Sequence, residues 1–149
     1  MISSVLIIAF SFVLLVYWFR YTCILILRTR TAVDYSPDVV TANNLRFPEV
    51  QTRLDQAATA PQLNALHESL AHDYRLLTYL LRHTAGLSVG GFPLEQRVLM
   101  LDFRVMQVFY ALASTLGLPQ AKGALEEMAN ILRHFSNAMG ERAAANSRA

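Results

Sequence analysis

The first 19 residues carry no charged side chain, and this run constrains the fold more than any other feature of the chain. Between Ile2 and Phe19 the chain contains apolar or aromatic residues and only three serines. As a helix this segment is about 27 Å long, close to the roughly 30 Å of hydrocarbon in a bilayer. A core helix of a small soluble domain keeps a polar face, and this segment has none. The sequence therefore predicts a single transmembrane helix that continues to about Thr29.

We expect this segment to remain attached as an anchor and not to be cleaved as a signal peptide. No basic region precedes it, and no small-residue cleavage site follows it. Aromatic and basic side chains follow instead, as they do at membrane–water interfaces. The residues assigned to the membrane interface are Tyr17, Trp18, Arg20, Tyr21, Arg28 and Arg30.

The distribution of basic residues predicts the location of the chain. Those near the apolar run all lie on its C-terminal side, which by the positive-inside rule places the following domain in the cytoplasm. Of the 13 basic residues only Lys122 is a lysine, a skew typical of a GC-rich bacterial genome. We therefore expect a single-pass protein of the bacterial inner membrane, with membrane lipid as one partner. The net charge of +2 is too small to favour a nucleic-acid partner.

Composition and turn residues divide the chain into four parts. The predicted parts are the anchor with its juxtamembrane helix (1–30), a connector with short helices (31–60), a helical bundle (61–140) and a disordered tail (141–149). The helices of the connector begin near Pro37 and Pro48, because proline favours the first turn of a helix. Ser36 is the expected N-cap of the first of them.

Three longer helices are predicted within the bundle, each with proline at its start and glycine at its end. They run from Pro61 to near Gly86, from Pro93 to Gly117 and from Pro119 to Met139, where Gly140 is expected to stop the helix. Short connections favour antiparallel neighbours, and no segment alternates like a half-buried strand. The predicted fold class is all-α, with one N-terminal transmembrane helix followed by a small antiparallel three-helix bundle and short accessory helices.

The second of these helices carries two apolar stripes, so we expect it to be the central helix. The first stripe is predicted to form the core, together with Phe135 of the third helix. Its members are Leu94, Val98, Leu101, Val105, Val108 and Leu112. The second stripe exceeds what two neighbouring helices must cover, so either the short helices at 37–57 cover it or it is a binding surface for a ligand or partner. Its members are Leu99, Phe103, Met106 and Tyr110.

Asp102 lies inside the apolar arc of the same helix and is the most unusual polar residue of the chain. A buried carboxylate is costly unless it has a partner or a raised pKa. The basic residues that neighbouring helices offer are Arg75, Arg82, Arg133 and His134. We expect Asp102 to form a structural ion pair that fixes helix register, and the alternative is that its carboxyl binds a ligand or partner.

No catalytic residue, metal ligand or cofactor is predicted. The chain lacks the Glu-x-x-His pairs of di-iron bundles, any Cys cluster and any Gly-x-Ser-x-Gly elbow. The expected function is therefore non-catalytic: an accessory subunit or adaptor that binds membrane or cytoplasmic proteins, or a second copy, at the cytoplasmic membrane face. One alternative is a carrier or sensor of an apolar ligand, such as a lipid or quinone. A less favoured one is a membrane-bound enzyme that uses Asp102.

Overall fold

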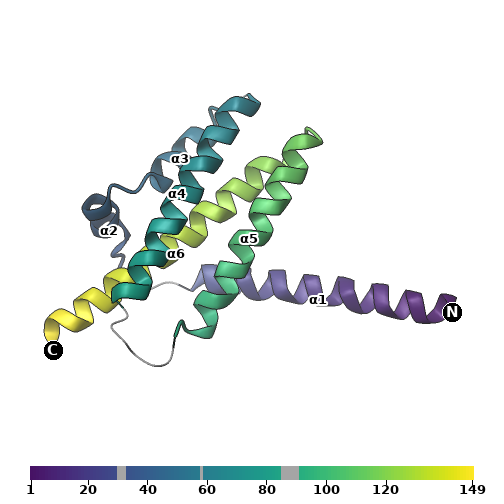
Figure 1. Ribbon diagram of the computed structural model, residues 1–149, viewed down its shortest axis with the longest axis horizontal. Helices are drawn as coiled ribbons and strands as arrows, with labels where there is room; N and C mark the ends of the chain where they lie inside the picture. The colour runs from purple at the N-terminus through teal and green to yellow at the C-terminus, as the bar shows by residue number, and fades with distance from the viewer. Residues whose placement is uncertain (30–32, 58, 85–90) are drawn as a thin grey trace. The chain divides into compact units, whose positions relative to one another are not determined.

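The computed structural model describes residues 1–29, 33–57, 59–84 and 91–149 (Figure 1). Its helices are α1 (Ile2–Arg28), α2 (Ser36–Asn43), α3 (Phe47–Leu54), α4 (Ala60–Thr84), α5 (Leu94–Thr115) and α6 (Gln120–Arg148). None of the described residues forms a β-strand, which confirms the all-α fold class. Two of the sequence predictions, the interfacial position of Arg30 and the helix end at Gly86, lie outside the described residues. The chain divides into an N-terminal unit, Met1–Arg30, and a helical domain, Thr31–Ala149.

Within the N-terminal unit, Ile2–Arg28 form one continuous helix, as the uncharged run predicts. Helix α1 has 27 residues, or about 40 Å at 1.5 Å per residue. Its large apolar side chains are exposed over nearly the whole length, and the helix is long and apolar enough to cross a membrane. Helix α5 is also long and apolar enough to cross a membrane, although a third of its most apolar segment is buried within the protein.

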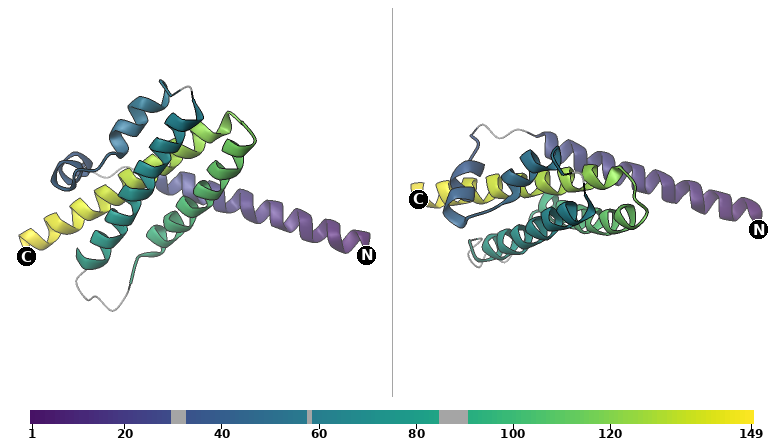
Figure 2. Two further views of the ribbon diagram at one scale, coloured as in Figure 1. Left: turned by 45° about the horizontal axis from the view of Figure 1, so that its top comes forward. Right: turned by 90° about the horizontal axis from the view of Figure 1, so that it is seen from above.

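The central helix of the domain is α6, which contacts α2, α3, α4 and α5 (Figure 2). The expectation that the helix at 93–117 is central is therefore wrong. Helix α6 buries small residues on the face that meets the other helices, which lets these helices approach its backbone closely. These small buried residues are Ala121, Ala124, Ala129, Ser136 and Gly140. Larger side chains such as Leu125 and Phe135 fill the space between the helices.

Helix α6 continues through Gly140 to Arg148, so the predicted helix end and the predicted disordered tail are both wrong. A Cβ atom built on Gly140 would collide with the Cβ of Tyr35, which precedes α2. This glycine therefore permits a close approach between two segments and does not end the helix. The three alanines at 143–145 favour continuation of the helix.

The two short helices pack on the domain and bury most of their large apolar side chains. Helix α2 contacts α6, and α3 contacts both α4 and α6. Ser36 is the first residue of α2 and not its N-cap. Its backbone N–H donates to Asp34 Oδ1 at 3.0 Å and to Asn137 Oδ1 at 2.8 Å, which links α2 to α6. The Arg133 guanidinium of α6 reinforces this link with a 2.9 Å ion pair to Asp34.

The start of α3 is capped by a side chain from α4. One carboxylate oxygen of Asp73, Oδ2, accepts the backbone N–H groups of Arg46 at 2.6 Å and of Phe47 at 2.8 Å. These donors have no partner within α3, because the first N–H groups of a helix lack one. Asp73 is 1% exposed, and this burial raises the pKa of its carboxyl above 3.8 against the opposing effect of the two N–H donors.

Candidate interaction surfaces

The structure reverses the roles predicted for the two apolar stripes of α5. The second stripe, proposed as a binding surface, is buried: Leu99 and Phe103 are 0% exposed, Tyr110 is 3% and Met106 is 6%. The first stripe, predicted as core, points outward, with Leu101 54% and Val108 62% exposed. The four residues of the second stripe therefore belong to the domain core and offer no free surface.

Ring stacking between α4 and α5 accounts for this choice of face. Tyr74 stacks on Phe103 with ring centroids 4.0 Å apart and planes 5° apart. His67 stacks on Tyr110 at 4.6 Å and 14°, and the Tyr110 hydroxyl donates to Asn64 Oδ1 at 2.6 Å. These ring contacts hold the second stripe of α5 against α4.

A signal for this orientation is present in the sequence. Arg97 and Arg104 lie beside the first stripe on a helical wheel, whereas the second stripe has no basic neighbour. Both arginines are exposed in the structure. The two arginines therefore indicate that the first stripe of α5 is the one that faces outward.

We call the outward stripe and its edge the α5 outer face. Its apolar members are Leu94, Leu101, Val105, Val108 and Leu112, all of them exposed. Arg97 and Arg104 form one edge of this face. The stripe covers about 27 Å of helix at 1.5 Å per residue. Contiguous exposed apolar patches on protein surfaces often mark interaction sites.

Asp102 is fully buried, in agreement with its place in the apolar arc. Three of the four predicted ion-pair partners make other contacts. Arg133 pairs with Asp34, the Arg75 Nε–H donates to the Ala71 carbonyl at 3.3 Å, and the Arg82 guanidinium lies 5.8 Å from the Phe92 ring centroid. The fourth, His134, is partly buried, which lowers the pKa of its imidazole below 6.5. The structural role expected for Asp102 stays a prediction.

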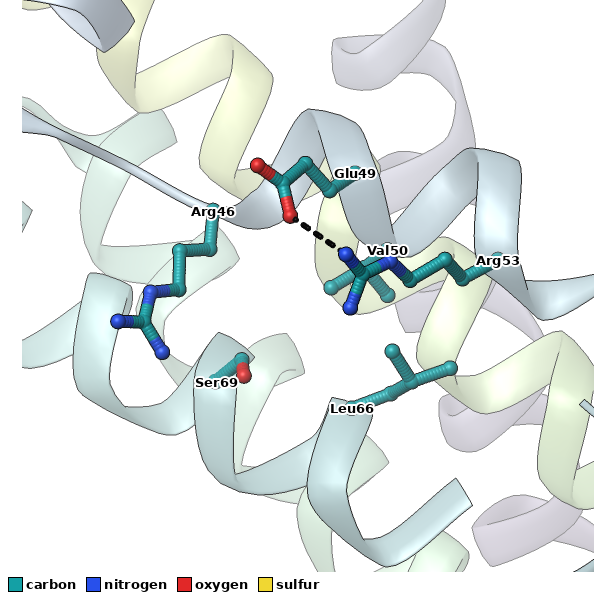
Figure 3. Close-up of a pocket in the computed structure, with 6 residues that line it drawn as sticks. All are labelled: Arg46, Glu49, Val50, Arg53, Leu66 and Ser69. Carbon is teal, nitrogen blue, oxygen red and sulfur yellow. Dashed lines mark ion pairs between the residues drawn. The ribbon is translucent and has the colours of Figure 1, made fainter. Parts of the chain in front are cut away.

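A polar groove lies between α3 and α4, and Figure 3 shows its residues. Its volume is about 320 Å³, at the lower end of the range for small ligand sites. The groove is lined by Arg46, Glu49, Val50, Arg53, Leu66 and Ser69. We call it the α3–α4 groove.

The charges of the α3–α4 groove favour an acidic ligand group. Two guanidinium groups, those of Arg46 and Arg53, flank it, and in Figure 3 the Ser69 side chain lies between them. Glu49 is the acid among the lining residues, and it pairs with Arg53 at 3.3 Å on the exposed surface. The Val50 and Leu66 side chains are buried and provide an apolar wall.

The groove has no clear signature in the sequence, because its residues come from two helices whose contact no local pattern reveals. Its detectable part is the Glu49–Arg53 pair, four residues apart on one helix face. Such pairs are common on solvated helices, so the pair by itself did not indicate a site.

Within the described parts of the chain, no group of three or more His, Cys, Asp and Glu side chains could hold a metal ion. The chain matches no known protein family, no characterised protein and no solved structure.

Proposed function

We propose that this chain is a single-pass membrane protein that acts as a non-catalytic adaptor and binds a partner protein at the cytoplasmic membrane face. Helix α1 serves as the anchor, and the basic residues after it support a cytoplasmic location for the helical domain. The observation that carries the adaptor role is the α3–α4 groove with its two flanking guanidinium groups. Its partner is a segment that carries Asp or Glu.

The groove can hold a carboxylate by exchange of ion pairs. A partner carboxylate between Arg46 and Arg53 would replace Glu49 as the acceptor for Arg53 and supply one for Arg46. Arginine binds carboxylates in a bidentate geometry, which fixes the direction from which the partner carboxylate approaches. One exposed ion pair contributes only about 0–1 kcal/mol, so selective binding requires both arginines and the apolar wall.

Site-specific photo-crosslinking tests this proposal on the full chain in the membrane of the cells that make it. A photo-reactive residue at Ser69 should crosslink to a protein segment rich in Asp and Glu. The double variant Arg46→Glu/Arg53→Glu should abolish this crosslink, because it places repelling charges on both sides of the groove. Arg75→Glu is the matched control, since Arg75 is an exposed arginine of α4 outside the groove. Crosslinks that survive the double charge reversal would contradict the groove as the binding site.

A topology reporter tests the anchor separately. A phosphatase active only outside the cytoplasm, fused after Ala149, should stay inactive, and a cytoplasmic reporter at the same position should be active. The opposite pattern would overturn the orientation, and recovery of the full chain in the soluble fraction would overturn the anchor.

A further inference from the structure

The α5 outer face is a second surface that the domain leaves uncovered. Helix α5 packs on α6, whereas α3 packs on α4 and α6, and the residues that line the α3–α4 groove do not come from α5. An adaptor that binds its partner in the groove therefore still exposes this apolar stripe. Leu94, at its N-terminal end, is 76% exposed.

Charge distribution indicates what covers the face. Arg97 and Arg104 lie two turns apart along the same edge, and both are exposed. The two acids of α5 lie elsewhere: Asp102 is buried, and Glu95 projects about 100° away from the Leu94 direction. The exposed edge is thus cationic beside an apolar stripe, the pattern of helices that lie in the interface of an anionic bilayer.

A second copy of the chain suits this face less well. Two antiparallel α5 helices packed face to face would bring their arginine edges to the same side. Two parallel helices would offer one acid, Glu95, for two arginines. A bilayer that contains anionic lipid supplies phosphate groups along the whole edge and acyl chains under the whole stripe.

We propose that the α5 outer face lies in the interface of the bilayer that α1 spans, with its apolar side chains among the acyl chains and Arg97 and Arg104 on lipid phosphates. The anchor makes even weak contact effective, because it keeps the domain near the surface at a high local concentration. This inference rests on the anchor of the proposed function but not on the α3–α4 groove. Neutralising either arginine should weaken the contact about fivefold in anionic vesicles, with a smaller effect at high salt.

Two fluorophores in the full chain test the inference. Cys23 is the sole cysteine and Trp18 the sole tryptophan, so Cys23→Ser with Val108→Cys gives one labelling site on the face. An environment-sensitive dye on that cysteine reports on α5, and Trp18 reports on insertion of α1. The chain is reconstituted in phosphatidylcholine vesicles with or without phosphatidylglycerol, and with lipids that carry a quencher near the headgroup. Leu112→Cys is a second site on the face, and Lys122→Cys, on an exposed part of α6, is the control.

We expect dye at Val108→Cys and Leu112→Cys to shift to shorter wavelength and to be quenched by the lipid, more strongly with phosphatidylglycerol. Dye at Lys122→Cys should remain in a water-like environment. Arg97→Ala/Arg104→Ala should weaken quenching on the face, whereas Arg75→Ala should not.

Three results would overturn the inference. Water-like dye on the face with a quenched Trp18 would leave the anchor intact and refute contact with the bilayer. A blue-shifted dye without lipid quenching would mean that protein, such as a second copy, covers the face. An unquenched Trp18 would remove the anchor and this inference together, without affecting the groove.

Discussion

The Asp73 carboxylate gives the sharpest test of how the domain is held together. Asp73→Ala removes the acceptor of the Arg46 and Phe47 backbone N–H groups, which lie 2.6 and 2.8 Å from Oδ2. Phe47 is itself 1% exposed, so water cannot easily replace the lost acceptor at its N–H. Asp73→Asn keeps an oxygen in the same place and removes only the charge.

The magnitude follows from these two contacts. Loss of an N-cap acceptor costs about 0.5–2 kcal/mol, and leaving a buried donor unsatisfied costs about 1–3 kcal/mol. Because water can reach the Arg46 N–H more easily, we expect a total loss of about 2–4 kcal/mol for Asp73→Ala. Asp73→Asn should cost roughly 0.5–1.5 kcal/mol, since both N–H groups keep an acceptor and a buried charge disappears.

Urea unfolding of the full chain in mild detergent, followed by circular dichroism, measures this difference. Helix α1 stays in the micelle, so the transition reports on the helical domain. Asp55→Ala is the control, because Asp55 is an exposed acid next to α3, and surface changes cost about 0.5 kcal/mol or less. Equal and small losses for the alanine and asparagine variants would refute the capping role.

The pH dependence provides a second check on Asp73. Burial raises the pKa of the carboxyl in the folded state above its unfolded value of 3.8. Folding therefore favours the protonated Asp73 carboxyl. The stability that this preference contributes is complete below pH 3.8 and is lost as the pH rises through the folded pKa. The stability advantage of the wild type over Asp73→Asn should thus shrink as the pH rises above 3.8.

Three further predictions use the same unfolding assay. Gly140→Ala should destabilise the domain by about 1–3 kcal/mol, because the new methyl group would clash with Tyr35. Gly123→Ala should stabilise the domain by about 0.5–1 kcal/mol, because there is open space around Gly123. A change of the same sign in both variants would contradict the close approach at Gly140. Phe135→Ala should cost about 3–5 kcal/mol, because Phe135 is fully buried, and Leu101→Ala should cost about 0.5 kcal/mol or less, because Leu101 is half exposed. The reverse order of losses would mean that α5 packs on the domain through its opposite face. Burial lowers the pKa of the His67 imidazole below 6.5, so the stability of the domain should fall as the pH drops from 6.5 through the folded pKa. His67→Phe should flatten this pH dependence while keeping the ring stack on Tyr110. An unchanged pH dependence in His67→Phe would contradict the role of His67.

Local chemistry was sufficient to predict where most helices begin. Prolines at 37, 48, 61, 93 and 119 lie at or next to the starts of α2 to α6, because a fixed φ and a missing N–H suit that position. The uncharged run likewise predicted α1 as one helix. These features depend on short stretches of sequence and need no knowledge of neighbours.

The errors concern contacts between distant segments. Gly140 matches a helix stop in sequence, but its role depends on Tyr35, about a hundred residues earlier. The two stripes of α5 are both apolar, and the choice between them depends on rings that α4 supplies, such as Tyr74. The α3–α4 groove depends on the packing of two helices in the same way. Periodicity gives the faces of a helix but not the partner that each face meets.

The link between α2 and α6 has a consequence for the kinetics of folding. Helical bundles usually fold fast, because most of their contacts join residues close in sequence. Here the hydrogen bond from Ser36 to Asn137 spans 101 residues, and the ion pair from Asp34 to Arg133 spans 99. Closing so long a loop carries an entropic cost before any contact compensates for it. Docking of α2 on α6 should therefore be a late event, and the domain should fold more slowly than its helix content suggests.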